Sequence, residues 1–462
     1  MPAASRRVRW ALLAIVVGGA VLRIAWALRM KEPVELRDPV LYLILADHLA
    51  AGDGYRYGFE ADQGLTAYYP PGYPLLLGGT VWLARLALPG TVSAFDAAIW
   101  LNVALSVATI GLVYVLGRRL AGPAVGLVAA GIWAVWPNLV FHSGIVLTET
   151  LFLFLLVLLL VLLLADRERA EAPGVARLAA VGALFGLVLL VRPVSAVMVP
   201  FLLLLWWGRG ARAALWRLGV VVAAAVVVLV PWSIRSTAVM DEPVALSLNF
   251  GDNLCLGHNP GATGGFGDLG AHCFTAEGMQ RPEAETRRNS ENIDRALTYI
   301  RENPGETLRR TPSKLRHTMQ NDADGLQVAE DFGLQPLFSD STRRVLRTTA
   351  TGFYVVVGLA AVGGGVVLLR RRRHTRALFL VVGGLAQLLS PLATFGDPRF
   401  KMPLYPTLAV CAAAGVVALW EARAGHERGT SPVTDDTSSG AGADPGSAVE
   451  GERSADPSPA TA

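Results

Sequence analysis

The sequence predicts an all-α polytopic membrane protein, and three observations support this fold class. Hydrophobic residues make up 53% of the 462 residues and charged residues only 17%, whereas a soluble chain of this length needs more charge to cover its surface. The apolar residues gather in runs long enough to cross a bilayer. Short arginine clusters lie beside several of these runs, which is the charge pattern that sets the orientation of membrane helices.

About ten apolar runs approach the roughly 20 residues that a helix needs to cross the hydrocarbon core. They are 10–29, 97–117, 122–141, 145–165, 175–191, 194–207, 214–232, 348–369, 377–395 and 402–420. The basic stretch Met1–Arg9 precedes the first run, which lacks a convincing cleavage site. We therefore expect this run to be a retained span and not a signal peptide.

An eleventh run, 73–88, is shorter, contains Gly78–Gly79 and ends near Arg85. If the N-terminus is cytoplasmic and 73–88 does not cross, the arginine clusters at 118–119, 166–177, 208–217, 370–373 and 423 all fall inside. A crossing would move nearly all of them outside, against the positive-inside rule. We predict that 73–88 is a juxtamembrane or re-entrant helix of the first outer loop; the alternative is an eleventh span.

This topology divides the chain into four parts. Residues 1–232 form an N-terminal transmembrane module with a first outer loop at 30–96, and 348–424 form the C-terminal transmembrane helices. Residues 233–347 are predicted to be a small external lid domain, with Gly-rich turns at 257–270 and an amphipathic helix near 284–303. The tail 425–462 is rich in Ser, Gly, Ala, Pro and Asp, so it is predicted to be disordered and cytoplasmic.

Two carboxylates lie at the outer ends of predicted spans. Asp38 follows the first span directly, where it could act as general base for a hydroxyl presented from the aqueous side. The alternative is that it caps the helix that follows, with Pro39 in the first turn. Glu149 begins the fourth span on the same face of the membrane as Asp38 and is the second acidic candidate. The alternative is that it only stabilises a helix start capped by Thr148.

Cations also lie at outer helix ends, the side that the positive-inside rule disfavours. They are Arg192, Arg235, and Arg399 with Lys401. A guanidinium suits phosphate because its planar fork donates two hydrogen bonds at once. These residues are therefore candidates for donor-phosphate or substrate binding. For Arg399, pairing with Asp397 or snorkelling toward lipid headgroups is the alternative.

Five motifs, in order, resemble those of GT-C membrane glycosyltransferases. They are DPVLYLILADHLAAGDGY, AYYPPGYPLLLGG, SGIVLTETLF, RPVSAVMVP and FGDPRFKMPLYPTLAV. The resemblance runs from about residue 10 to 420 and is closest to the bacterial family 39 branch, akin to protein mannosyltransferases and the aminoarabinose transferase of lipid A.

The resemblance implies a GT-C fold and transfer of a sugar from a polyprenyl-phosphate donor to a glycan, lipid or protein acceptor at the outer face of the plasma membrane, with inversion. Asp38 stands where the family has its first-loop catalytic acid, and Glu149 where relatives carry a second acid. Several relatives have two adjacent acids in the first loop, whereas Pro39 follows Asp38 here. The alternative is a transporter or flippase of a lipid-linked sugar, but the mid-span regions carry almost no charge and show no internal repeat.

The remaining candidates lie in the outer loops. Tyr69, beside Tyr68, could stack on a sugar ring or sit in the interfacial belt, and His258 and Asn259 could face the donor. Cys255 and Cys273 are predicted to form a disulfide, because thiol pairs outside the cytoplasm tend to be oxidised. The sequence has no metal-type CxxC pair, no P-loop and no GxGxxG motif, so no cofactor or metal site is predicted, with a divalent metal left open.

Overall fold

The computed structural model describes residues 3–56, 64–164, 174–267, 272–274, 282–331, 336–370 and 374–429. Its regular secondary structure is helical, and the only β pairing in these residues is two isolated bridges, Arg56–Leu65 and Gly265–Gly396. Met1–Trp420 form one compact unit, and Glu421–Ala462 a second. The predicted lid and the membrane helices thus belong to the same unit. The tail predicted to be disordered lies, beyond Gly429, outside the described residues.

All ten predicted spans coincide with helices. Within the residues that the structure describes, six helices are long and apolar enough to cross a membrane: Arg6–Ala27, Ala94–Ala121, Ala211–Met240, Asp340–Arg370, Thr375–Ala393 and Pro398–Ala424. The other four are shorter apolar helices: Pro123–Val135, Glu149–Leu163, Val175–Val191 and Pro193–Arg209. The predicted run 122–141 is divided at Trp136, because Pro137 cannot donate a backbone hydrogen bond and starts a new helix.

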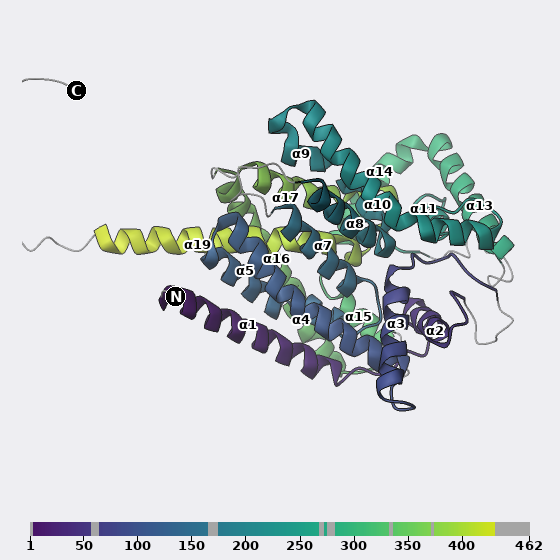
Figure 1. Cartoon of the computed structure of the whole chain (residues 1–462), viewed down its shortest axis with the longest axis horizontal. Helices are drawn as coiled ribbons and strands as arrows, with labels where there is room; N and C mark the ends of the chain where they lie inside the picture. The colour runs from purple at the N-terminus through teal and green to yellow at the C-terminus, as the bar shows by residue number, and fades with distance from the viewer. Residues whose placement is uncertain are drawn as a thin grey trace, which may run out of the picture. The chain divides into compact units, whose positions relative to one another are not determined.

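Figure 1 shows the membrane helices of the first unit packed side by side. In chain order they are α1 (Ala3–Ala27), α4 (Ala94–Ala121), α5 (Pro123–Val135), α6 (Pro137–His142), α7 (Glu149–Leu163), α8 (Val175–Val191), α9 (Leu203–Trp206), α10 (Ala211–Met240), α16 (Asp340–Arg370), α17 (His374–Ala386), α18 (Leu389–Ala393) and α19 (Tyr405–Gly429). Short 3-10 helices flank α9, and another, η4 (Pro398–Leu404), precedes α19.

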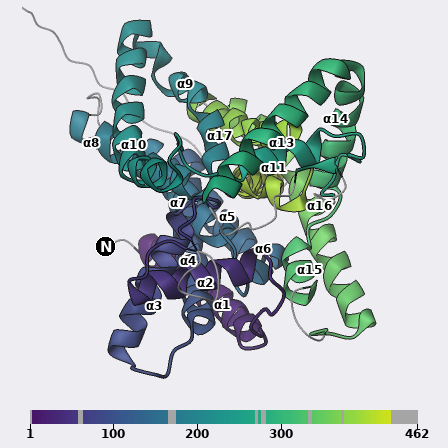
Figure 2. The same ribbon diagram turned by 90° about the vertical axis from the view of Figure 1, so that its right-hand side faces the viewer.

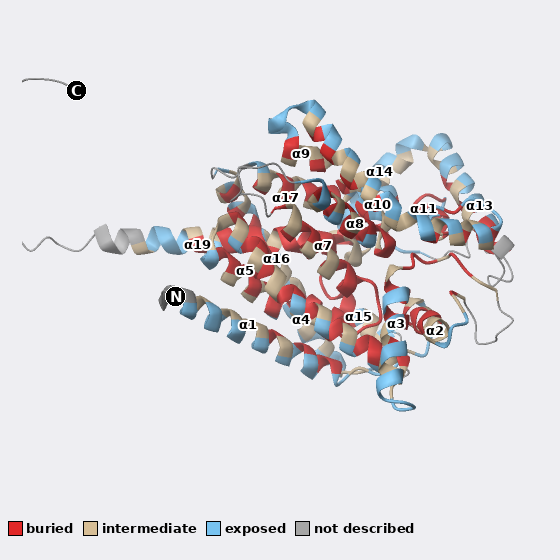
Figure 3. Ribbon diagram, in the orientation of Figure 1, coloured by how far each residue is buried: buried red, intermediate tan, exposed pale blue. Residues whose placement is uncertain are grey.

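Small residues let these helices approach closely. A Cβ on Gly364 of α16 would lie 1.7 Å from the carbonyl oxygen of Cys411 in α19, and one on Gly182 of α8 would lie 2.3 Å from the carbonyl oxygen of Val221 in α10. Close contact through glycine is typical of membrane helix packing. The opposite faces of α10 and α16 carry exposed apolar residues, as expected of helices that face lipid. Figure 3 shows exposed positions along α10.

The first loop, predicted to face outside, contains two helices, α2 (Asp38–Ala51) and α3 (Gly72–Ala87), which pack against each other. The helix α3 covers the predicted run 73–88, has 16 residues and is not among the described helices that are long and apolar enough to span. It packs against α2, α4 and α8. That 73–88 is a juxtamembrane or re-entrant helix stays a prediction.

The predicted lid contains α11 (Phe250–Gly257), α13 (Pro282–Glu302), α14 (Pro304–Met319) and α15 (Asp324–Asp331). The predicted amphipathic helix near 284–303 corresponds to α13, which packs against α11. Within the first unit, α11 and α13 lie at the same end as α2 and α3 (Figure 1). Figure 2 shows α15 beside α6, with which it is in contact. The lid therefore touches both the first loop and the membrane helices.

Candidate active site

The Asp38 carboxylate stands at the first residue of α2 and forms two contacts away from that helix. Its Oδ1 accepts a hydrogen bond of 2.6 Å from the Tyr69 hydroxyl, and its Oδ2 lies 3.7 Å from Arg399 Nη1. The residue at the N-cap is Arg37, and its side chain makes no capping bond. Asp38 therefore does not cap α2, which was the alternative considered from the sequence. Its side chain is 44% exposed, so a substrate can reach it.

Tyr69 is buried, and its ring packs against Tyr42 at a centroid distance of 4.8 Å and against Tyr68 at 5.0 Å. Sequence reasoning assigned Tyr69 to substrate binding through its ring. The structure instead covers the ring with other aromatic residues and directs the hydroxyl at Asp38. In this arrangement Tyr69 is a positioning residue for the carboxylate.

Arg399 lies on η4 between two carboxylates. Asp397 caps η4 by accepting a 2.9 Å hydrogen bond from the Arg399 backbone N–H, and its Oδ1 also lies 3.3 Å from Arg399 Nε. The pairing with Asp397 considered from the sequence is thus present, and the same guanidinium reaches Asp38. The side chain keeps 22% of its surface exposed, so it can approach a bound phosphate.

Glu149 and Arg192 are paired with each other. Glu149 starts α7 and is buried; its Oε1 forms an ion pair of 2.5 Å with Arg192 Nη2, at the C-terminal end of α8. Thr148 makes no capping bond, and its Oγ1 lies 3.3 Å from Arg192 Nε. Burial raises the pKa of Tyr42 well above its ordinary value, and the charges of Asp38 and Glu149 raise it further, so both carboxylates act on this ring.

Direct contacts join Asp38, Tyr69, Arg399 and Asp397 into one cluster, and Glu149 pairs separately with Arg192. Taken together, the two groups contain three carboxylates and two guanidinium groups, an excess of one negative charge. In the part of the chain that the structure describes, no group of three or more His, Cys, Asp and Glu residues is arranged to hold a metal ion.

Lys401 does not face this cluster. It is fully buried, and its Nζ donates hydrogen bonds to the carbonyl oxygens of Asn321 (2.6 Å) and Pro398 (3.0 Å) and pairs with Asp322 Oδ1 at 3.1 Å. The sequence assigned it, together with Arg399, to phosphate binding because both lie at the outer end of a predicted span. Its contacts instead fix η4, the element that carries Arg399, to the segment that precedes α15.

Arg235 also has a different environment from the one predicted. Its guanidinium donates to the carbonyl oxygens of Thr66 and Tyr55 and lies over the rings of Trp232 and Tyr55, at 5.0 and 5.6 Å. A phosphate-binding role was assigned because arginine lies here at the outer end of a span. The backbone of the first loop is its observed partner, so Arg235 ties that loop to α10.

His258 and Asn259 have structural contacts at the end of α11. His258 Nε2 lies 2.9 Å from the Ala393 carbonyl oxygen and 3.0 Å from Lys314 Nζ. Burial, helped by the charge of Lys314, lowers the pKa of His258 to about 4, so the ring is neutral at physiological pH. Asn259 Nδ2 donates to the Cys255 carbonyl oxygen at 2.8 Å. Neither contact involves the Asp38 cluster.

Cys255 of α11 forms a disulfide with Cys273, with an S–S distance of 2.11 Å and a Cα–Cα distance of 6.0 Å. The third cysteine, Cys411, is free and buried. This is the pairing that the sequence predicts. The disulfide ties the end of α11 to the segment that leads toward α13.

A set of hydrogen bonds between the lid and the first loop was not predicted from the sequence. Glu285 of α13 accepts hydrogen bonds from Thr66 Oγ1 (2.6 Å) and from the Ala67 backbone N–H (3.0 Å). Next along the loop, the Tyr68 hydroxyl donates to Asp252 Oδ2 of α11 at 2.6 Å.

Asp252 is in turn held by the lid. It forms an ion pair of 2.6 Å with Arg288 and accepts a hydrogen bond of 2.7 Å from Asn292 Nδ2. Glu285, Arg288 and Asn292 follow a spacing of three and four residues, which places them on one helix face. The stripe is visible in the sequence, but its partners in the first loop and α11 are not.

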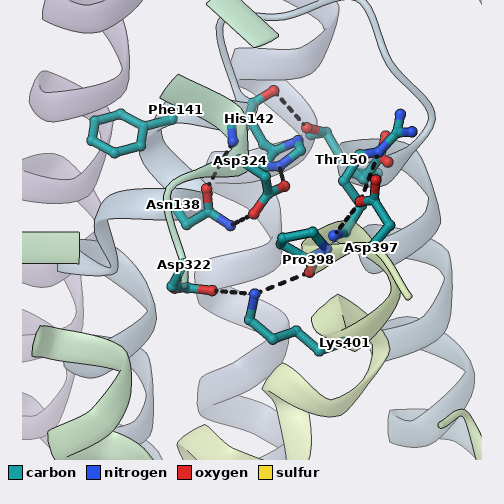
Figure 4. A network of polar contacts seen from close by, with 12 residues as sticks. Asn138, Phe141, His142, Thr150, Asp322, Asp324, Asp397, Pro398 and Lys401 are labelled. Carbon is teal, nitrogen blue, oxygen red and sulfur yellow. Dashed lines mark hydrogen bonds and ion pairs between the residues drawn. The ribbon is translucent and has the colours of Figure 1, made fainter. Parts of the chain in front are cut away.

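A second buried network joins α15 to the membrane helices (Figure 4). Asn138 Nδ2 donates to Asp324 Oδ1 at 2.8 Å, and His142 Nε2 lies 2.7 Å from Asp324 Oδ2. In the figure both α6 residues point at Asp324, and Lys401 points at Asp322. These two aspartates have no apolar run beside them, so hydropathy gives no signal for them.

Comparison with known proteins supports the fold. The sequence profile of a family described as "Dolichyl-phosphate-mannose-protein mannosyltransferase" matches residues 79–234. No curated protein sequence matches the chain significantly.

Two of the solved structures that are similar to this chain are of the same archaeal protein. The oligosaccharyltransferase AglB from Archaeoglobus fulgidus, in complex with an inhibitory peptide and a dolichol-phosphate, is 14% identical over 91% of this chain and 51% of its own, with a TM-score of 0.51. Its apo form is 15% identical over 90% and 51%, with a TM-score of 0.50. The chain thus spans about half the length of the archaeal enzyme.

ArnT from Cupriavidus metallidurans bound to undecaprenyl phosphate is 15% identical over 87% of this chain and 77% of its own, with a TM-score of 0.38, too low to support an argument. The profile match and the archaeal structures confirm the resemblance to GT-C transferases and the GT-C fold. At these identities the structures establish the fold alone.

Proposed function

We propose that this GT-C-fold membrane protein is an inverting glycosyltransferase that moves a hexosyl or pentosyl group from a polyprenyl-phosphate carrier to an acceptor hydroxyl. The observation that supports this best is the exposed Asp38 carboxylate with Arg399 Nη1 at 3.7 Å. Transfer from a glycosyl phosphate needs a base for the acceptor proton and a cation for the departing phosphate. The cluster offers both within one site.

In the proposed reaction, Asp38 accepts the proton of the acceptor hydroxyl while the hydroxyl oxygen forms a bond to the anomeric carbon. The bond from that carbon to the phosphate oxygen breaks on the opposite side, and its electron pair leaves with the lipid phosphate. Arg399 stabilises the charge that develops on this phosphate. The products are a glycosylated acceptor with inverted configuration, a polyprenyl phosphate and protonated Asp38.

The comparisons support the donor class. The archaeal oligosaccharyltransferase is described in complex with a dolichol-phosphate, and the matching family profile is described as a dolichyl-phosphate-mannose-protein mannosyltransferase. We propose the same class of lipid phosphate for this chain, with the lid residues 233–347 covering it. The acceptor class, a glycan, a lipid or a protein, is identified by comparing surface glycans and polyprenyl-phosphate sugars in cells with and without the gene.

The test uses the full-length protein in lipid nanodiscs with a panel of polyprenyl-phosphate sugars. Asp38→Asn removes the proton acceptor, so turnover should fall roughly 10²-fold or more. The control is Asp47→Asn on the same helix: Asp47 is 49% exposed and pairs with Arg85, and this variant should stay within about twofold of wild type. Near-normal transfer by Asp38→Asn would exclude it as the base, and movement of the intact donor between leaflets without transfer would favour a flippase.

We also propose that the site faces outside and that both termini are cytoplasmic. Tags at Gly122, Arg209 and the C-terminal tail should then be labelled from the cytoplasm, and tags near Asn259 and Asp397 from outside. The charge distribution supports this arrangement. Labelling of Gly122 and Asn259 from the same side would contradict it.

Finally, we propose that the protein's own side chains suffice for the reaction. Dialysis against EDTA should then leave transfer within about twofold of its starting rate, because no step requires a Lewis acid. Loss of activity that Mn²⁺ or Mg²⁺ restores would show that a divalent ion takes part.

A further inference from the structure

The N-terminal turn of α10 borders a basic pocket far from the Asp38 cluster. The pocket has a volume of about 560 Å³ and is lined by Arg209, Gly210, Ala211, Arg212, Ala213, Trp216 and Arg217. Among the described residues, the lining contains three arginines and no acidic residue. Its chemistry therefore favours an anion.

The backbone contributes to the same preference. Gly210, with a φ of 90°, is the N-cap of α10 and has no side chain to cap the helix. The first N–H groups of a helix have no intrahelical acceptor, and the helix dipole adds a partial positive charge there. An uncapped N-terminus of this kind readily binds a phosphate. Ala211, Arg212 and Ala213, which carry these groups, all line the pocket.

Arg217 is an independent indication of a ligand. The residue is only 8% exposed; its Nη1 donates to the Ala213 carbonyl oxygen at 3.1 Å, while its buried Nε has no hydrogen-bond partner. The positive-inside rule accounts for arginines in this loop, but it does not require one to be buried. Burying a guanidinium without full pairing is unfavourable, and an anion bound to its remaining N–H groups would offset part of that cost.

The position of the pocket identifies the source of the anion. Arg235, near the other end of α10, contacts the first loop, and 24 residues of helix separate it from Ala211, which is roughly 36 Å. That distance is close to the thickness of the hydrocarbon core, so the pocket lies at the opposite membrane surface. Trp216 in its lining and the neighbouring Trp207 are both more than half exposed, as is typical of residues at headgroup depth.

We propose that this pocket binds the phosphate of an anionic phospholipid headgroup in the leaflet opposite the candidate active site. The phosphate oxygens accept hydrogen bonds from the first turn of α10 and from Arg212 and Arg217, while Trp216 lies against the glycerol region. The proposal does not depend on the transfer reaction.

The experiment is native mass spectrometry of the full-length protein in detergent, titrated with dioleoyl phosphatidylglycerol or dioleoyl phosphatidylcholine. Wild type should bind the first lipid at least about tenfold more tightly. Arg212→Gln should weaken that binding about fivefold, and the double change Arg212→Gln with Arg217→Gln about 30-fold, at roughly 1 kcal/mol for each arginine. The single variant alters an exposed residue, so it tests the proposal even if the double variant does not fold.

The matched control removes two positive charges elsewhere. Arg118 and Arg370 lie at the ends of α4 and α16, are exposed and belong to the arginine clusters predicted on the same side of the membrane. Their double change to Gln should leave phosphatidylglycerol binding unchanged. An equal loss in this control, or no loss in Arg212→Gln, would overturn the proposal. Displacement of the lipid by low-millimolar inorganic phosphate would also overturn it, because the pocket would then be a site for free phosphate.

Discussion

The Tyr69 hydroxyl donates a hydrogen bond of 2.6 Å to Asp38 Oδ1, and the Tyr69 ring is fixed by Tyr42 and Tyr68. A rigid donor on one carboxylate oxygen sets the direction of the other. This relationship gives Asp38 a defined orientation even though its side chain is partly exposed.

Tyr69→Phe should keep the ring packing and remove the donor. We expect kcat to fall by roughly 10- to 10²-fold with the donor KM nearly unchanged, because a misoriented base slows the reaction without weakening binding. Steady-state kinetics measures both constants. Tyr299→Phe, on α13, is the control. A raised KM with normal kcat would mean that Tyr69 binds the donor, as the sequence suggested.

Arg399→Lys should be poorly tolerated. An ammonium is a point charge without the guanidinium fork, so the donor KM should rise about tenfold or more. Asp397→Asn keeps a side-chain oxygen that can cap η4 but removes the charge that pairs with Arg399. It therefore separates this pairing from the binding of the donor phosphate. If Arg399 only pairs with Asp397, both variants should lower the melting temperature alike and leave donor affinity at the wild-type value.

The free energy of unfolding should fall with rising pH because of Glu285, which joins the lid to the first loop. Burial raises the pKa of Glu285 to about 7, although its hydrogen bonds from Thr66 and Ala67 and the charges of Arg235 and Arg288 lower it. A carboxyl with a raised pKa in the folded state contributes its full stability below its unfolded pKa of about 4.5, and this contribution is lost as the pH rises through about 7.

The melting temperature of wild type should therefore decrease relative to that of Glu285→Gln between pH 5 and pH 8. Differential scanning fluorimetry across this range measures the difference. Glu291→Gln, an exposed change on the same helix, should follow wild type. Parallel curves for wild type and Glu285→Gln would show that the Glu285 carboxyl does not titrate in this window.

The Cys255–Cys273 bond predicts a labelling pattern. Denatured without reductant and alkylated, the protein should carry one label, at Cys411, as judged by mass spectrometry of its peptides. Closing this loop should stabilise the fold by about 3 kcal/mol, so Cys255→Ser should lower the melting temperature. Alkylation of Cys255 and Cys273 in the unreduced sample would rule the bond out.

Hydropathy and charge predicted the helical framework because each is a local property of the chain. The ten apolar runs became helices, and α3 has the length and cover expected of a juxtamembrane element. Position at a predicted outer helix end also selected Asp38 and Arg399, which lie beside each other, and Glu149 and Arg192, which form an ion pair.

The same criterion misplaced Arg235 and Lys401. A guanidinium or ammonium at a helix end can meet a ligand, a backbone carbonyl or a carboxylate, and only tertiary packing decides which. Lys401 pairs with Asp322, and Arg235 donates hydrogen bonds to backbone carbonyls of the first loop. The bond between Thr66 and Glu285 joins residues 219 apart in the chain, beyond the reach of any periodicity.

The two adjacent tyrosines of the first loop have partners in different parts of the protein. Tyr68 donates to Asp252 of the lid and Tyr69 to Asp38, while consecutive Cα atoms are only 3.8 Å apart. A lid movement that carries Tyr68 by several ångströms therefore draws the Tyr69 hydroxyl off the carboxylate. If Asp38 is the base of the proposed transfer, such a movement would remove its alignment and leave an entering water molecule unactivated, which would protect an unused donor from hydrolysis.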